Sequence, residues 1–250
     1  MTSKNDQIKN IESEKQGKNY LSHIYSEERR PISNYPLELA KLIIQRNHIK
    51  TNANLLDAGC GKGDLLKAFK KNNLNVEGVD LSEESVKFLS PIKVYQKNLE
   101  KEIIEERENY YDIIFSKSLI EHLNSPLKFI RNCKSLLKDN GCLVIMTPSW
   151  YHHKFGPFYL DYTHVTPFTL HSLRDIGTLG GFSDINVEYF YQLPFTCNNP
   201  YLKILPKVIS FFRVPYYPMY EGLFPIKFPN QLNTLIRFSR EVMLYAVMRK

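Results

Sequence analysis

The sequence has few of the features that mark secreted, zinc-binding or membrane-spanning proteins. It contains only four cysteines and no C-x-x-C pair, which argues against both a zinc knuckle and a disulfide framework. Residues 1–17 are polar and charged, without the apolar stretch of a signal peptide. The most apolar run, residues 201–214, is interrupted by two lysines, a proline and an arginine, so no segment is expected to cross a bilayer. These features together predict a cytoplasmic protein.

Internal repeats and low-complexity tracts are also missing from the sequence. With 250 residues and 43% hydrophobic content, the chain fits one large domain, or one domain with an insertion, and a mostly disordered chain is disfavoured. The formal net charge of +7 is compatible with anionic partners, but a moderately basic protein without such partners fits equally well. No Asn/Asp-Pro-Pro-Tyr/Phe motif and no stacking platform is evident, so nucleic acid is a disfavoured partner.

Segments with helix and strand patterns alternate along most of the chain. Residues 1–30 are predicted to form a loose polar arm that precedes one domain over residues 31–250. Helices are predicted at 37–44, 64–71, 82–90, 126–138 and 169–179, and strands at 54–57, 76–80, 93–96, 112–116, 142–147 and 185–191. This alternation predicts an α/β fold with a mostly parallel sheet and helices on both faces.

A glycine-rich loop follows the first predicted strand. Residues 57–63 read Asp-Ala-Gly-Cys-Gly-Lys-Gly, so three glycines at alternate positions allow the backbone to pass close to a ligand. The acid before the loop suits a ligand with an ammonium and a sulfonium group better than a pyrophosphate. About twenty residues later, the second strand ends in Asp80, where a carboxylate can bind a ribose diol.

These two elements resemble the first motif and the ribose-binding acid of class I S-adenosylmethionine (SAM)-dependent methyltransferases. The resemblance extends over about residues 35–192, and it implies a Rossmann-like seven-stranded sheet whose last strand, expected at 241–249, is antiparallel. Asn98 departs from the family, which usually has an acid beside adenine, and Leu119–Leu123 resembles the family's "LEH" element. The resemblance implies SAM as cofactor and the binding residues Asp57, Gly59, Cys60, Gly61, Gly63, Asp80, Leu81, Asn98, Leu99 and Ser116.

The segment after the fifth strand is rich in aromatic and histidine residues. Asp161–Thr169 resembles a D-x-T-H-x-x-P-F-T stretch of bacterial methyltransferases from polysaccharide and lipopolysaccharide pathways. His164 could be the general base, oriented by Asp161, or it could only hold the loop. His122, with Glu121, is a second candidate base, although a turn that packs under the cofactor explains it as well. The spacing of Asp161, His164, His152 and His153 permits a metal, but no distinctive ligand set is present and none is expected.

The C-terminal part holds an unusual insertion, expected at about 192–240. From residue 194 on, eight basic side chains face two acidic ones, and seven prolines are interspersed with aromatic and aliphatic residues. Two interpretations remain open. The segment could contact a membrane surface peripherally through about 195–230, at the inner membrane face, or it could be a lid or dimer contact that packs on the domain.

Four functions fit these observations. The leading expectation is O-methylation of a sugar hydroxyl on a glycan or glycolipid precursor, because of the Asp161–Thr169 loop. The main alternative is O-methylation of a quinone or another membrane-borne phenol. A nucleic-acid methyltransferase or RNA-binding module and a non-catalytic SAM-binding protein are the remaining alternatives. The fold alone does not choose among acceptors, and the sequence does not indicate the oligomeric state.

Overall fold

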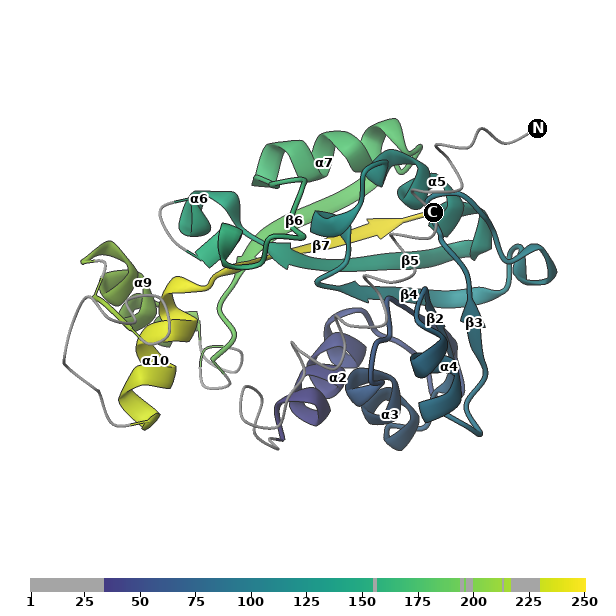
Figure 1. Cartoon of the computed structure of the whole chain (residues 1–250), viewed down its shortest axis with the longest axis horizontal. Helices are drawn as coiled ribbons and strands as arrows, with labels where there is room; N and C mark the ends of the chain where they lie inside the picture. The colour runs from purple at the N-terminus through teal and green to yellow at the C-terminus, as the bar shows by residue number, and fades with distance from the viewer. Residues whose placement is uncertain (1–33, 155–156, 194–195, 197–199, 213, 217–229) are drawn as a thin grey trace.

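The computed structural model describes residues 34–154, 157–193, 196, 200–212, 214–216 and 230–250. The predicted N-terminal arm lies outside these residues. Seven strands form one sheet in the order β3-β2-β1-β4-β5-β7-β6 (Figure 1). The strands are β1 (Asn54–Ala58), β2 (Asn75–Asp80), β3 (Val94–Gln96), β4 (Tyr111–Lys117), β5 (Leu137–Pro148), β6 (Asp184–Phe190) and β7 (Met243–Arg249).

Six of the seven strands run in the same direction. The neighbours from β3 to β5 pair in parallel, whereas β7 lies antiparallel between β5 and β6. Its near-continuous burial, from Met243 to Met248, reflects this central position in the sheet. The predicted Rossmann-like architecture with an antiparallel last strand is confirmed.

Helices cover both faces of the sheet (Figure 1). One face carries α2 (Tyr35–Arg46), α3 (Asp64–Lys71) and α4 (Glu83–Phe88), and the other carries α5 (Pro126–Leu136) and α7 (Leu170–Leu179). The two largest hydrophobic cores among the described residues follow from this layering. The first joins α2 and α3 to the sheet through residues such as Ile43 and Phe69, and the second joins α5 and α7 through Phe129, Ile130 and Leu173.

Local sequence explains where several helices begin. The Ser82 side chain accepts a hydrogen bond from the Glu84 amide at the start of α4. Thr169 and Ser172 form a reciprocal capping box at the start of α7, which closes the aromatic segment after β5. Both caps lie near the carboxyl edge of the sheet, so they fix the loops that surround the candidate site.

The helix predicted at 126–138 is two residues too long. In the structure α5 ends at Leu136, and Leu137 already pairs with Tyr111 of β4 before a register shift. Asn140 turns the chain with a φ of 64°, and a Cβ at Gly141 would lie 2.9 Å from the Lys138 carbonyl oxygen. A long-range strand pair therefore ends the helix, where the sequence predicted that a local Asn-Gly stop would do so.

Short helices that the sequence did not predict lie beside the sheet's carboxyl edge and between β6 and β7. These are α6 (Trp150–His153), η3 (Pro157–Leu160), η4 (Pro200–Lys203), α9 (Ile204–Phe211) and α10 (Asn230–Arg240). In Figure 1, α9 and α10 project beyond the end of the sheet at which β5 terminates. Among the described helices, none has the length and hydrophobicity needed to cross a membrane.

Candidate active site

The parallel strands bring four loop starts to one edge of the sheet. β1, β2, β4 and β5 end at Ala58, Asp80, Lys117 and Pro148. The direction of chain progression reverses between β1 and β4, and ligands of open α/β sheets bind at such a switch point, outside the carboxyl ends of the strands.

The glycine loop at this edge adopts the conformation that its sequence requires. Gly59, Gly61 and Gly63 have φ values of 80°, 49° and 75°, in the left-handed region that side chains other than glycine rarely enter. The loop is tied to β2, because the Gly59 amide donates to the Val79 carbonyl (2.8 Å) and the Gly61 amide donates to Oδ2 of Asp80 (2.8 Å). These hydrogen bonds fix the backbone of the loop at the end of β2, beside the switch point.

Bulky neighbours leave little space for a side chain at two of the loop's three glycines. A Cβ at Gly63 would lie 2.2 Å from Leu89, and one at Gly59 would lie 3.2 Å from Leu119. Cys60 is buried, and its Sγ would lie 2.8 Å from a Cβ at Gly78 of β2. The Cys60 side chain therefore packs against the sheet, and burial raises the pKa of its thiol well above the usual range. Only its backbone is available to a ligand.

Two carboxyl groups lie close together beneath the loop. Burial, reinforced by the charge of Asp80, raises the pKa of Asp57 to about 7. Burial also raises the pKa of Asp80, although hydrogen bonds from the Ser82 and Gly61 amides work against this shift. Oδ1 of Asp80 accepts a hydrogen bond from the Ser82 amide (2.9 Å), and Oδ2 accepts the one from the Gly61 amide. The pair forms a buried acidic centre that favours a cationic ligand.

The other predicted binding residues lie around this centre in different ways. Leu81 is half exposed beside Asp80, and Leu99 is buried. Oδ1 of Asn98 accepts a hydrogen bond from the Glu100 amide (2.9 Å), so one lone pair is already used within its own turn. The hydroxyl of Ser116 is buried and donates to the Ala58 carbonyl (3.1 Å), which links the ends of β4 and β1. The Ser116 side chain thus supports the loop from below.

The turn after β4 is joined to the segment after β5. Ser118 has a φ of 55°, and the turn continues into the short helix η2 (Ile120–His122). The Glu121 carbonyl accepts hydrogen bonds from the Val165 and Thr166 amides (2.9 and 3.0 Å). The loop singled out by its histidine and aromatic content is therefore fixed directly over the Glu121–His122 turn.

Glu121 is fully buried, and its two carboxyl oxygens differ in their hydrogen bonding. Its Oε2 accepts a hydrogen bond from Thr147 Oγ1 (2.9 Å), whereas Oε1 has no hydrogen-bond partner among the described residues. Burial raises the pKa of Glu121 to about 7, against the lowering effect of the Thr147 bond. A buried acceptor atom of this kind is costly unless a ligand or function uses it.

Asp161, Thr163 and His122 form a chain of hydrogen bonds that the sequence did not predict. Thr163 Oγ1 donates to Oδ1 of Asp161 (2.5 Å) and lies 2.9 Å from Nδ1 of His122. Because the single hydroxyl proton of Thr163 goes to Asp161, Nδ1 of His122 is the donor, and its Nε2 carries the lone pair. Burial lowers the pKa of His122 to about 4, so the ring is neutral at neutral pH. The sequence contained one sign of this arrangement, the Asp-x-Thr spacing.

His164 is held by a backbone carbonyl, where the sequence suggested Asp161 as the orienting group. Its Nδ1 lies 2.6 Å from the Phe158 carbonyl oxygen and must donate to it, so Nε2 again carries the lone pair. Burial also lowers the pKa of His164. The rings of His122 and His164 meet edge to face with centroids 4.6 Å apart.

Glu121, His122 and His164 form the compact polar cluster of the site. Each offers one ligating atom, and these atoms lie within 4.8 Å of one another, a spacing that suits one acceptor hydroxyl or one bound ion. Among the described residues, His152 and His153 do not join this group. Their Nδ1 atoms bind Ser149 instead, at Oγ and at the carbonyl oxygen respectively (both 3.0 Å).

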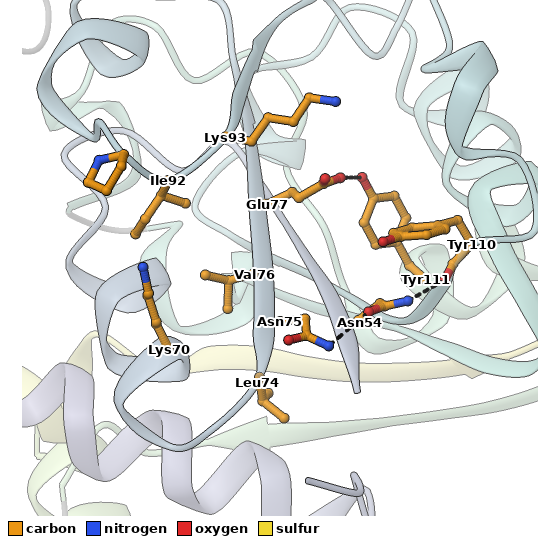
Figure 2. Close-up of a pocket in the computed structure, with 11 residues that line it drawn as sticks. Asn54, Lys70, Leu74, Asn75, Val76, Glu77, Ile92, Lys93, Tyr110 and Tyr111 are labelled. Carbon is orange, nitrogen blue, oxygen red and sulfur yellow. Dashed lines mark hydrogen bonds between the residues drawn. The ribbon is translucent and has the colours of Figure 1, made fainter. Parts of the chain in front are cut away.

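A separate pocket lies at the opposite edge of the sheet (Figure 2). Its volume is about 280 Å³, and it is lined by residues at or just before the starts of β1 to β4, including Asn54, Asn75, Lys93 and Tyr111. Glu77 accepts hydrogen bonds there from Tyr111 and Arg107 (2.6 and 2.8 Å). Because this pocket opens at the amino ends of the strands, it is distinct from the glycine loop and the histidine cluster.

Comparisons with known proteins agree with this geometry. A family model described as "Methyltransferase domain" matches residues 27–187. The ubiquinone biosynthesis O-methyltransferase of Bordetella avium (strain 197N) is 33% identical over 100 residues, which cover 37% of this chain and 42% of that protein. The protein of the same name from Histophilus somni (strain 2336) is 30% identical over 129 residues, 45% of this chain and 51% of its own length. The chain thus matches about half the length of these curated relatives.

Solved structures share the fold at low sequence identity. A SAM-dependent methyltransferase from Archaeoglobus fulgidus superposes with a TM-score of 0.57 at 22% identity, covering 90% of this chain and 97% of that one. Phosphoethanolamine N-methyltransferase 2 of Haemonchus contortus, solved with SAM, gives a TM-score of 0.57 at 18% identity, covering 92% and 58%. The family match, the sheet order and the glycine loop agree. This chain belongs to the methyltransferase-domain family and has its Rossmann-like class I fold.

Proposed function

We propose that this chain is a SAM-dependent O-methyltransferase whose acceptor is a phenolic hydroxyl on a quinone-type, membrane-borne precursor. The observation that carries the proposal is the juxtaposition of the acidic glycine-loop centre with the Glu121–His122–His164 cluster at one sheet edge. The curated relatives named above act, by their names, in ubiquinone biosynthesis. Their similarity favours the phenolic acceptor over the sugar hydroxyl that the Asp161–Thr169 loop first suggested.

The residues present fit a bound SAM molecule. The left-handed glycines let a ligand approach the loop backbone closely, the Asp80 carboxylate at the end of β2 could bind ribose hydroxyls, and Asp57 offers negative charge to a cationic ligand. Leu81, Leu99 and Asn98 would surround the adenine. When bound, SAM supplies an electrophilic methyl group on a sulfonium. Its positive charge would favour the ionised form of Asp57. Because the pKa of Asp57 is near neutral, this ionisation costs little free energy at neutral pH.

The cluster of Glu121, His122 and His164 would receive the acceptor hydroxyl. The Nδ1 atoms of both rings have fixed partners, Thr163 Oγ1 for His122 and the Phe158 carbonyl oxygen for His164, and a neutral imidazole can accept the hydroxyl proton. We assign the general base to His122, with Glu121 as the buried carboxylate that stabilises the resulting imidazolium. His164 would orient the hydroxyl and complete the wall of the site together with Phe158, whose ring centroid lies 4.7 Å from that of His164.

The test is a methyl-transfer assay in which a soluble catechol competes with a soluble hexose for methyl groups from SAM, read by mass spectrometry. Methylated catechol is expected. His122→Asn should lower kcat/KM by about 10²–10⁴-fold, although its side-chain amide can still donate a hydrogen bond to Thr163. His171→Asn, an exposed histidine on α7, serves as the matched control. Methylated hexose without methylated catechol would overturn the acceptor class, and transfer to neither would overturn the proposed function.

A further inference from the structure

The surface formed by η4 and α9 turns its apolar side chains outward. Tyr201, Phe211 and Phe212 are 80%, 79% and 70% exposed, and Ile204 and Val208 are exposed as well. Pro206 is buried instead, and Lys203, Ile209 and Ser210, which lie one helical turn from it, are only partly exposed. The outward side of α9 is therefore mostly apolar, whereas an ordinary surface helix exposes a polar face. Such a patch marks an interaction site.

α9 is held in place by the rest of the chain, so its outward face is a fixed feature. It packs against α10, which leads into the central strand β7. Arg240 at the end of α10 is buried, donates to the Val214 carbonyl (2.9 Å) and lies over the ring of Tyr216, 5.3 Å from its centroid. This anchor connects the patch to the methyltransferase sheet.

The charge of this surface selects among the possible occupants. Residues 200–212 carry Lys203 and Lys207 and no acidic residue. Lys207 is three residues after Ile204 and four before Phe211, so the cation lies on the apolar face itself. A symmetric contact with a second copy would bring this basic face against itself, whereas an anionic bilayer offers both negative headgroups and an apolar interior.

We infer that η4 and α9 dock this chain peripherally on a membrane surface rich in anionic phospholipid. The eight-residue helix is about 12 Å long, too short to span a hydrocarbon core of about 30 Å, and it would lie in the interface plane. Tyr201, Phe211 and Phe212 would insert at headgroup level, with Lys203 and Lys207 beside the phosphates. Docking would bring the carboxyl edge of the sheet toward the bilayer, because α9 projects beyond that edge (Figure 1).

The membrane docking rests on the proposed function only for the identity of the acceptor. Vesicle flotation tests the docking without SAM or acceptor. The probe is a phosphatidylcholine vesicle with or without about 30 mol % phosphatidylglycerol, at low and high salt. Wild-type protein is expected to float with the anionic vesicles and much less with the neutral ones. Phe211→Ser/Phe212→Ser should reduce partitioning at least about 10-fold.

Two further variants test the contribution of charge and control for the loss of an exposed phenylalanine elsewhere. Lys207→Glu should weaken flotation at low salt more than at high salt. Phe88→Ser removes a phenylalanine of α4 that is 68% exposed and that has Lys67 beside its ring. This variant should leave flotation unchanged. Thermal melting of each variant shows that it is folded.

Three outcomes would overturn the inference. The first is wild-type protein that stays in the bottom fraction with every vesicle. The second is an equal loss of flotation in Phe88→Ser. The third is a dimer, measured by light scattering, that Phe211→Ser/Phe212→Ser dissociates without an effect on vesicles. A failure to methylate a soluble catechol would leave the flotation result unaffected, so the two proposals fail separately.

Discussion

Nδ1 of His122 lies 2.9 Å from Oγ1 of Thr163, although the two residues are 41 positions apart. This contact joins the turn after β4 to the loop after β5. The Thr163 hydroxyl donates its hydrogen bond to Asp161, so this one threonine sets the tautomer of the His122 ring. The arrangement resembles a base–orienter pair with an intervening hydroxyl.

Replacing Thr163 tests this role. Thr163→Val keeps the shape of the side chain but removes the acceptor for Nδ1, so kcat for methyl transfer should fall about 10–100-fold with a smaller change in KM. Thr163→Ser should restore most of the rate. The pH–rate profile should shift in the valine variant only, because His122 loses its orienting bond. Equal losses in both variants would indicate a packing role alone.

Asp57 should make the stability of the ligand-free protein pH-dependent. Its pKa rises from 3.8 to about 7 on burial, so the folded state holds this proton more tightly than the unfolded state. The stability that the protonated form provides is complete below about pH 4 and is lost as the pH rises through about 7. Asp57→Asn should therefore raise the free energy of unfolding at pH 8 by about 1–3 kcal/mol and have little effect at pH 4. Urea titrations at both pH values measure this difference, and an equal effect at both would contradict it.

Glu77 should show the opposite dependence. Burial alone would raise its pKa, but hydrogen bonds from Arg107 and Tyr111 outweigh burial and hold the pKa below 4.5. The stability from these bonds is present above about pH 4.5 and is lost as the pH falls through the lowered value. Glu77→Gln should cost about 1–2 kcal/mol at pH 7 and less near pH 3, as measured by urea unfolding. A cost that grows toward low pH would argue against the hydrogen bonds from Arg107 and Tyr111, the second of which is drawn in Figure 2.

Cys60 and Gly78 should be energetically coupled. Gly78→Ala places a methyl group 2.8 Å from Sγ of Cys60 and should destabilise the fold by about 1–3 kcal/mol. The second substitution, Cys60→Ala, removes the sulfur and should recover part of that loss. A double-mutant cycle by chemical unfolding gives the coupling energy, and strictly additive effects would contradict the predicted contact.

The sequence predicted best what depends on neighbouring residues. The glycine loop, the strand-end acids Asp57 and Asp80, and the Ser82 cap are local patterns, and they were sufficient for the fold and family. The end of α5 was predicted wrongly because Leu137 pairs with Tyr111 of another strand. Thr163 was missed for the same reason, since its partner His122 is distant in sequence. The outward face of α9 was also beyond prediction, because it depends on which side packs against α10.

The most direct test of cofactor binding is calorimetric titration of the purified protein with SAM, with Asp80→Asn in parallel and melting curves for both. Micromolar affinity, about −8 kcal/mol, is expected for the wild type, and Asp80→Asn should bind at least about 10-fold more weakly while it remains folded. Wild-type protein that binds neither SAM nor S-adenosylhomocysteine would contradict the assignment of the glycine loop and the acidic centre as a SAM site.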